Sequence, residues 1–190
     1  MQIIKNCLGQ SHDIACRVVK EGDLVIDATA GNGNDTAFLA GLVGATGKVY
    51  AFDVQEKAIK NTTEKLEAQQ LRDRAILIHD SHENMTKYID GCVTLVMFNL
   101  GYLPGGDHNI STKFESTSKA IESAMSLLKI NGLIVMVVYY GGDSGFEEKN
   151  ALMEYIKNID SKHYSVMRAE FVNQANCPPL LICIEKLSNN

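Results

Sequence analysis

Short apolar segments alternate with amphipathic segments along most of the chain. Five apolar runs are expected to form strands, at residues 24–28, 48–53, 75–78, 93–98 and 133–139. The segments between them that have helical spacing or a helix-favouring composition are residues 34–43, 56–70 and 114–129. Continuous apolar strands separated by amphipathic helices predict a parallel sheet that helices cover on both faces.

The last part of the chain has a different pattern. A helix is expected at about 145–158, and two extended segments follow at 163–172 and 180–186. The residues between the extended segments leave no room for a helix, so these two strands must be antiparallel. We also expect Asn131-Gly132 to end the helix over 114–129 as a left-handed cap. The sequence therefore predicts βα units followed by a terminal β-hairpin.

Composition narrows the class of protein. The chain has 190 residues, of which 45% are apolar and 22% charged, and these values predict one globular domain over residues 1–190. The net charge of −5 argues against nucleic-acid binding through bulk positive charge, although a local basic patch stays open. The longest apolar run, residues 133–140, is much shorter than the ~20 residues that span a bilayer.

The cysteines and the first residues indicate where the protein works. The five cysteines are scattered and form no CxxC pair, so we expect neither a disulfide framework nor a metal site. No sustained apolar stretch follows Met1, so a signal peptide is not expected. A reducing cytoplasm fits these features best.

The first candidate site is the segment 27–36, Asp-Ala-Thr-Ala-Gly-Asn-Gly-Asn-Asp-Thr, at the end of the first strand. Glycines there let the backbone approach a ligand, and the following helix offers free N–H groups. The alternative is a simple tight turn between strand and helix. Thr36 replaces the third glycine of a GxGxxG loop, and Asp27 would repel a pyrophosphate. A ligand that carries an ammonium group therefore fits better than a dinucleotide.

Carboxylates also follow the second and third strands. Asp53 lies 22 residues after Gly31 and can accept both hydroxyls of a ribose, although a solvated acid at a strand end is the alternative. Asp80, within the segment His79-Asp80-Ser81-His82, can accept from an adenine amino group. The two histidines can pack on a cofactor or face solvent. All these groups lie at the carboxyl edge of the sheet, where open α/β folds bind ligands.

These residues resemble the class I methyltransferases that depend on S-adenosylmethionine (SAM). More narrowly, the chain is similar to the rRNA methylase family, which includes MnmM-type tRNA methyltransferases. The similarity is carried by residues 27–33, by the string Phe-Asn-Leu-Gly-Tyr-Leu-Pro-Gly-Gly-Asp at 98–107, and by the segments 178–180 and 184–186.

The resemblance implies a Rossmann-like sheet of seven strands in the order 3-2-1-4-5-7-6, with an antiparallel C-terminal strand. It places the methionine end of SAM at Asp27 and the Gly31–Gly33 loop, the ribose at Asp53 and the adenine near Asp80. The full set of expected cofactor-binding residues is Asp27, Thr29, Gly31, Asn32, Gly33, Asn34, Asp35, Thr36, Asp53, Gln55, Asp80, Ser81 and His82.

The expected catalytic segment, Asn99-Leu-Gly-Tyr102, follows the fourth strand. An asparagine oxygen can accept an amine N–H and aim the nitrogen lone pair, and an aromatic ring can stack on a base. Leu100 and Gly101 depart from the Pro-Pro that amino-methyltransferases commonly have there. An ordinary loop with a buried tyrosine is the alternative. Asn99, Tyr102 and Asp107 are the expected catalytic residues, the last as an acceptor that favours the neutral amine.

Other residues receive weaker assignments. Cys177 falls in the hairpin loop, so a nucleophilic role is not expected for it. His12 matches a family position, with capping, lid and catalytic roles all open. Lys113, Lys119, Lys162 and Arg168 are candidates for RNA contact.

The leading functional hypothesis is an N-methyltransferase that acts on RNA. The resemblance favours the 5-aminomethyl group of a (2-thio)uridine at the tRNA wobble position. The alternatives are an rRNA base methyltransferase, a small-molecule methyltransferase and a SAM-binding module without catalysis. A homodimer is compatible with the sequence, because it would enlarge the surface available to RNA.

Overall fold

The computed structural model describes residues 3–101, 114–141 and 145–189. Its sheet contains β1 (Leu24–Asp27), β2 (Lys48–Asp53), β3 (Ala75–His79), β4 (Val93–Leu100), β5 (Leu128–Val138), β6 (Tyr164–Ala169) and β7 (Leu180–Lys186). The helices are α1 (Cys7–Val18), α2 (Asn34–Val43), α3 (Glu56–Ala68), α4 (Phe114–Leu127) and α5 (Gly145–Lys157). Two short 3-10 turns, η1 (Arg72–Arg74) and η2 (His82–Lys87), flank β3.

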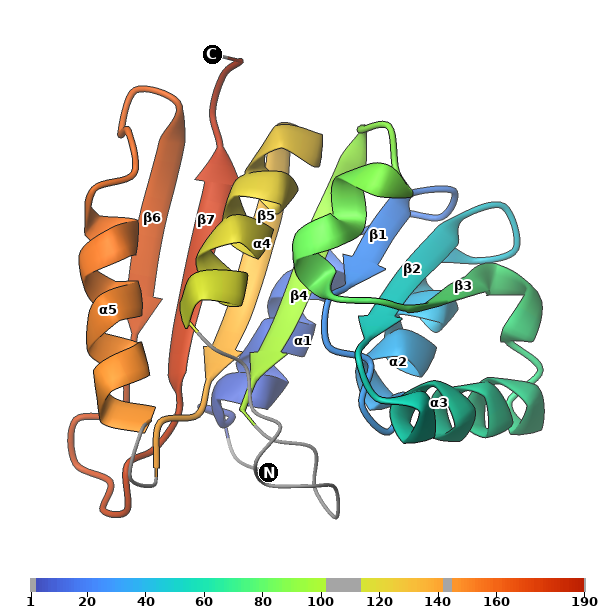
Figure 1. The fold of residues 1–190 in the computed structure, drawn as a ribbon, viewed down its shortest axis with the longest axis horizontal. Coiled ribbons are helices and arrows are strands. Elements are labelled where there is room, and N and C mark those ends of the chain that lie inside the picture. The colour runs from blue at the N-terminus through green and yellow to red at the C-terminus, as the bar shows by residue number, and fades with distance from the viewer. Residues whose placement is uncertain (1–2, 102–113, 142–144, 190) are drawn as a thin grey trace.

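The strand order is β3-β2-β1-β4-β5-β7-β6, which confirms the expected topology (Figure 1). Strands β1 to β5 pair in parallel, and β7 pairs antiparallel with both β5 and β6. The terminal hairpin is therefore present as predicted. Strand order reverses between β1 and β4, and open α/β sheets bind ligands at such a switch point.

Helices cover both faces of the sheet, and each face has its own apolar core. On one face Leu39, Leu66 and Val43 pack with strand residues such as Val25 and Leu95. On the other face Ile121 and Ala124 from α4, Met85 from η2 and Leu152 from α5 pack against Phe98 and its neighbours. In Figure 1, α4 and α5 accordingly lie in front of the sheet, while α1 and α2 lie behind it. Strands buried on both faces explain the continuous apolar runs of the sequence.

The end of α4 differs from the prediction. The helix ends at Leu127, β5 begins at the next residue, and Asn131 lies within that strand. The expected left-handed conformation is present at Asn131, with φ of 62°. It accompanies a shift in register between β4 and β5, because Val93 pairs with Leu128 and Leu95 pairs with Leu133. The expected cap is therefore a strand irregularity.

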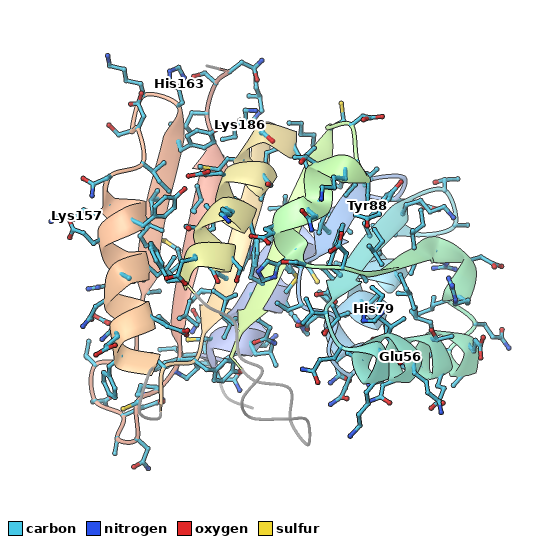
Figure 2. The ribbon with its side chains drawn as sticks, in the orientation of Figure 1. Glu56, His79, Tyr88, Lys157, His163 and Lys186 are labelled. Atoms are coloured by element: carbon cyan, nitrogen blue, oxygen red, sulfur yellow. The ribbon has the colours of Figure 1, made fainter. Side chains whose placement is uncertain are left out.

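A buried lysine holds the end of α4 instead. Lys186, which Figure 2 labels on the last strand, donates from Nζ to the carbonyl oxygens of Leu128 at 2.9 Å and Met125 at 3.4 Å. A cation favours the negative end of a helix, and its hydrogen bonds satisfy carbonyl groups that lack helical partners. The C-terminal strand thus fixes the helix that follows the expected catalytic segment.

The other predicted helices and strands begin and end within a few residues of the observed ones. β6 is shorter than the expected extended segment, and β4 continues to Leu100. Among the described residues, no helix combines the length and the apolar character that crossing a membrane requires.

Candidate active site at the carboxyl edge of the sheet

The loop between β1 and α2 takes its shape from two glycines. Gly31 and Gly33 have φ of 54° and 75°, a region that other residues adopt at a cost. A Cβ on Gly33 would lie 2.8 Å from the Cα of Thr62, so α3 leaves no room for a side chain there. The Thr62 hydroxyl also donates to the Gly31 carbonyl at 3.3 Å. The glycine at position 33 therefore allows α3 to pack directly against this loop.

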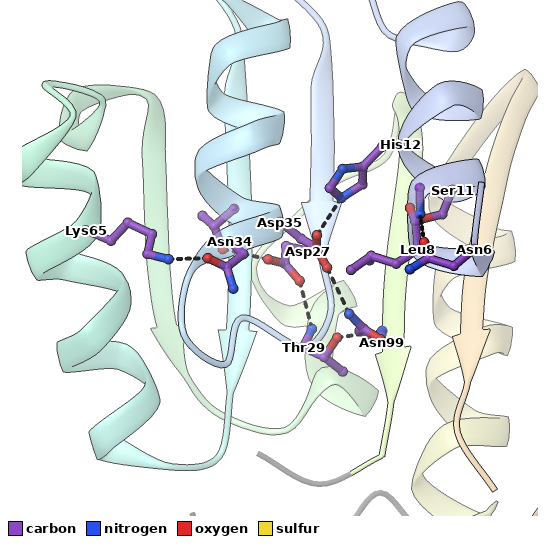
Figure 3. Close-up of polar contacts among 12 residues, drawn as sticks. Asn6, Leu8, Ser11, His12, Asp27, Thr29, Asn34, Asp35, Lys65 and Asn99 are labelled. Carbon is purple, nitrogen blue, oxygen red and sulfur yellow. Dashed lines mark hydrogen bonds and ion pairs between the residues drawn. The ribbon is translucent and has the colours of Figure 1, made fainter. Parts of the chain in front are cut away.

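The two asparagines of this loop face α3. Asn32 Oδ1 accepts a hydrogen bond from Asn61 Nδ2 at 2.9 Å, and Asn34 Oδ1 accepts one from Lys65 Nζ. Figure 3 shows the second contact. These bonds anchor the loop to α3. Asn32 and Asn34, both predicted to bind the cofactor, thus each form a hydrogen bond with another residue of the protein.

Asp27 is the most deeply buried acid of the site. Asp27 is 1% exposed. Its carboxylate accepts hydrogen bonds from the Thr29 backbone N–H at 3.1 Å and from the Thr36 hydroxyl at 2.6 Å. Burial raises the pKa of Asp27 to about 7, and the negative charges of Asp35 and Asp53 add to the rise. The site therefore contains a carboxyl group that changes its charge near neutral pH.

Asp53 connects the loop to the end of β2. Its two carboxylate oxygens accept from the backbone N–H groups of Gly31 and Gln55, both at 2.9 Å. Each oxygen keeps further acceptor capacity, because a carboxylate has about four lone-pair sites. The carboxylate is thus fixed beside the glycine loop, where it can still accept from a diol.

The segment after β3 separates into an exposed and a buried part. Asp80 accepts hydrogen bonds from Asn84 Nδ2 and the Tyr88 hydroxyl, both at 2.9 Å (Figure 2). The first of these holds the pKa of Asp80 below its ordinary value. Ser81 is the residue before η2, and its hydroxyl accepts from Glu83 N.

His82, by contrast, is buried. Its Nδ1 lies 3.0 Å from the Ala28 carbonyl oxygen, and its ring packs against Phe98 with centroids 5.7 Å apart. Burial lowers the pKa of His82, which favours the neutral ring. His82 therefore supports the loop after β1 from behind, while His79 is exposed and lies 3.0 Å from the Val54 carbonyl oxygen.

Asn99 lies at the end of β4, next to the loop after β1. Its backbone N–H donates to the Thr29 hydroxyl at 2.7 Å, and its side-chain Nδ2 donates to Asp35 Oδ2 at 3.2 Å (Figure 3). Its Oδ1 is buried and has no hydrogen-bond partner among the described residues. A buried acceptor without a partner is costly, and such groups commonly mark a ligand or a catalytic role.

The sequence left the role of His12 open, and the structure places it against Asp35. His12 Nε2 lies 2.7 Å from Asp35 Oδ1, and its ring stacks on Phe38 with centroids 4.0 Å apart. The residue comes from α1, far from the loop in sequence. The match of His12 to a family position was the signal available in the sequence, and it did not identify Asp35 as the partner.

The predicted RNA-contacting cations are not gathered at the site. Lys119, on α4, pairs with Glu83 of η2 at 3.7 Å. Arg168, on the outer strand β6, pairs with Glu170 at 3.3 Å. Lys162 is exposed before β6. Tyr102, Asp107 and Lys113 lie outside the described residues.

Comparison with known proteins identifies the family. Residues 49–185 match the family described as "Putative rRNA methylase". The chain belongs to this family. A chloroplastic tRNA (mnm(5)s(2)U34)-methyltransferase from Arabidopsis thaliana is 33% identical over 186 residues, which cover 93% of this chain and 68% of that protein.

Solved structures agree with this membership. A "putative rRNA-methylase" from Clostridium thermocellum is 60% identical, with a TM-score of 0.96 over 98% of this chain and 100% of that one. A "putative methyltransferase" from Streptococcus mutans, solved in complex with S-adenosylhomocysteine (SAH), is 41% identical. Its TM-score is 0.90, over 97% of this chain and 100% of that one. This rRNA methylase family member is a SAM-dependent methyltransferase.

The residues present fit SAM. The Asp53 carboxylate, held beside the Gly31–Gly33 loop, can accept from ribose hydroxyls. The unpartnered Oδ1 of Asn99 adds a buried acceptor on the neighbouring strand. When bound, SAM supplies an electrophilic methyl group, and the acidic surroundings suit its positive charge.

Proposed function

We propose that this protein methylates the primary amine of a 5-aminomethyl group on (2-thio)uridine at the wobble position of tRNA. The observation that carries the proposal is the buried Oδ1 of Asn99, which lies beside the loop after β1 and has no partner within residues 3–101, 114–141 and 145–189. The relative from Arabidopsis thaliana, whose name specifies position 34 of tRNA, supports the choice of RNA and nucleotide.

The chemistry of an amine substrate matches this acceptor. An amine attacks only with a free lone pair, and its direction is fixed when its N–H bonds have acceptors. Asn99 Oδ1 can accept one such bond, and the amide has no proton to lose, so it serves as an aligning group. A carbon nucleophile of a pyrimidine would gain nothing from this oxygen, since it carries no N–H to donate.

Aromatic groups near the end of β5 offer a place for RNA bases. Tyr139 is 47% exposed, and its backbone N–H donates to the carbonyl oxygen of Leu100, next to Asn99. Lys149 Nζ lies 4.7 Å from the ring centroid of Tyr140 and 5.4 Å from that of Phe146. Exposed rings and a nearby cation are the groups on which single-stranded RNA bases stack.

Methylation of ribosomal RNA is the second candidate, because the family description names rRNA. The two candidates use the same cofactor site and differ in the RNA that reaches Asn99. A tRNA anticodon loop presents its wobble base unpaired, which suits a small catalytic face that has to contact one base at a time.

The test uses the purified protein, SAM with an isotopically labelled methyl group, and tRNA and rRNA from cells that lack the gene. We expect label in the 5-methylaminomethyl nucleoside of tRNA, measured by mass spectrometry after digestion. Asn99→Ala should abolish most of the transfer, and Asn158→Ala, at an exposed asparagine after α5, is the matched control. Label in rRNA alone would favour the second candidate, and no label in any RNA would refute both.

A further inference from the structure

A chain of hydrogen bonds leads from helix α1 to the end of β4. His12 Nε2 lies 2.7 Å from one oxygen of Asp35, whose other oxygen accepts from Asn99 Nδ2 at 3.2 Å (Figure 3). Asp35 is 7% exposed, so water competes little for these contacts. Both oxygens of a residue expected to bind the cofactor are thus committed to two side chains of the protein.

This arrangement decides which way the Asn99 amide points. An ionised carboxylate only accepts hydrogen bonds, so the NH₂ group of Asn99 has to face Asp35. The amide oxygen then faces the opposite side, where it is buried and has no partner in the part of the chain that the structure describes. Without Asp35, the oxygen and the NH₂ group could exchange places, since an amide is nearly symmetric in shape. The flipped amide would offer a substrate amine a donor where it needs an acceptor.

We propose that Asp35 and His12 are positioning residues for methyl transfer, which act by fixing the Oδ1 of Asn99 toward the substrate amine. Asp35 sets the orientation of the amide. His12 donates from Nε2 to Asp35, and its stacking on Phe38, 4.0 Å between centroids and 10° between planes, holds the ring in place. The proposal rests on the proposed function, because it assumes that an amine reacts at Asn99.

The carboxylate also acts on the amide electronically. As the amine nitrogen bonds to the methyl carbon, the bond from that carbon to the sulfur of SAM breaks and S-adenosylhomocysteine leaves. Positive charge grows on the nitrogen, which afterwards loses a proton to solvent. A hydrogen bond from Nδ2 to a buried carboxylate polarises the amide and makes Oδ1 a stronger acceptor for that charge. Asp35 thus contributes to the reaction through Asn99 and without contact to the amine.

A double-mutant cycle tests this dependence, with single-turnover transfer of labelled methyl as the readout. We expect Asp35→Asn to lower the transfer rate by about 10–100-fold, since misalignment of a reacting group has costs of this size. The KM for SAM should change by less than about twofold. In an Asn99→Ala background the same substitution should change the rate by less than about twofold, because the group it positions is gone.

Two further variants complete the cycle. His12→Phe keeps the stacking on Phe38 but removes the bond to Asp35, and we expect it to lower the rate by a smaller factor, again only when Asn99 is present. Asp13→Asn is the matched control, because it removes a carboxylate from α1 that pairs with Lys5 at the surface. It should leave the transfer rate unchanged.

The outcomes separate this proposal from the proposed function. Wild-type protein that methylates no RNA refutes the function. Wild-type activity with fully additive effects of Asp35→Asn and Asn99→Ala refutes the positioning role. A rise in KM for SAM as large as the fall in rate would also refute it, and would make Asp35 a cofactor ligand, as the sequence suggested.

The orientation of the amide can also be measured without RNA. In ¹⁵N–¹H spectra, the side-chain NH₂ signals of Asn99, assigned by their loss in Asn99→Ala, should be shifted downfield and exchange slowly with solvent. His12→Phe keeps the Asp35 carboxylate and should retain most of this shift, whereas Asp35→Asn should remove it. Unchanged signals in a folded Asp35→Asn variant would overturn the proposal.

Discussion

The buried carboxyl group of Asp27 makes a quantitative prediction about stability. Its pKa of about 7 in the folded protein compares with an ordinary value of 3.8. The folded state therefore binds this proton more tightly than the unfolded state does. The resulting stabilisation is complete at acid pH and is lost as the pH rises through the folded pKa. Asp27→Asn places an uncharged side chain of the same shape at this position and removes the titration.

The size of the effect follows from the two pKa values. A difference of about three pKa units corresponds to about 4 kcal/mol in the free energy of unfolding, at 1.36 kcal/mol per unit. Part of this loss occurs below about pH 5, where the unfolded chain already releases the proton. Between about pH 5 and pH 8 the unfolding free energy of the wild-type protein should fall by about 2–3 kcal/mol relative to Asp27→Asn.

Urea unfolding without ligand, at several pH values across this window, measures the difference directly. Both proteins share every other titrating group, so the difference between their pH profiles reports Asp27 together with its electrostatic coupling to Asp35 and Asp53. Asp13→Asn, at an exposed position, should retain the wild-type profile. If Asp27→Asn and wild-type protein lose stability in parallel, the folded pKa of Asp27 lies near its ordinary value, and the reasoning from its burial is wrong.

Three further substitutions test the cofactor site and its support. Asp53→Ala should weaken SAH binding by about 10–100-fold in calorimetry, because hydrogen bonds to a charged group are lost; unchanged affinity would remove Asp53 from the site. Gly33→Ala should lower stability by ~1–3 kcal/mol, since it combines left-handed strain with a clash against Thr62. Lys186→Ala should cost about 2 kcal/mol by thermal unfolding, and a wild-type melting temperature would show that α4 needs no cation at its end.

The sequence predicted the fold well because its signals are local. Apolar runs, helical periodicity and the short connection before β7 predicted the elements, the parallel sheet and the antiparallel hairpin. The order of the strands came from the family resemblance, and the structure confirms it. The glycine loop and the carboxylates Asp27, Asp53 and Asp80 could be placed together for the same reason. Each follows a parallel strand, and parallel strands end at one edge.

Contacts between distant segments could not be predicted in this way. The cation at the end of α4 comes from Lys186 on the last strand, and the residues near Asn131 contain no pattern that could have predicted it. The link from His12 through Asp35 to Asn99 joins two helices and a strand. Such contacts depend on how the elements pack, and periodicity describes one element at a time.

The central claim is that SAM lies across the ends of β1, β2 and β3 with its reactive carbon facing Asn99. A crystal structure of the protein with SAM, or with SAH and an aminomethyl nucleoside, tests it most directly. We expect the ribose at the carboxylate of Asp53 and an amine or water within hydrogen-bond distance of Asn99 Oδ1. A cofactor bound elsewhere, or an Asn99 oxygen turned toward Asp35, would contradict the account.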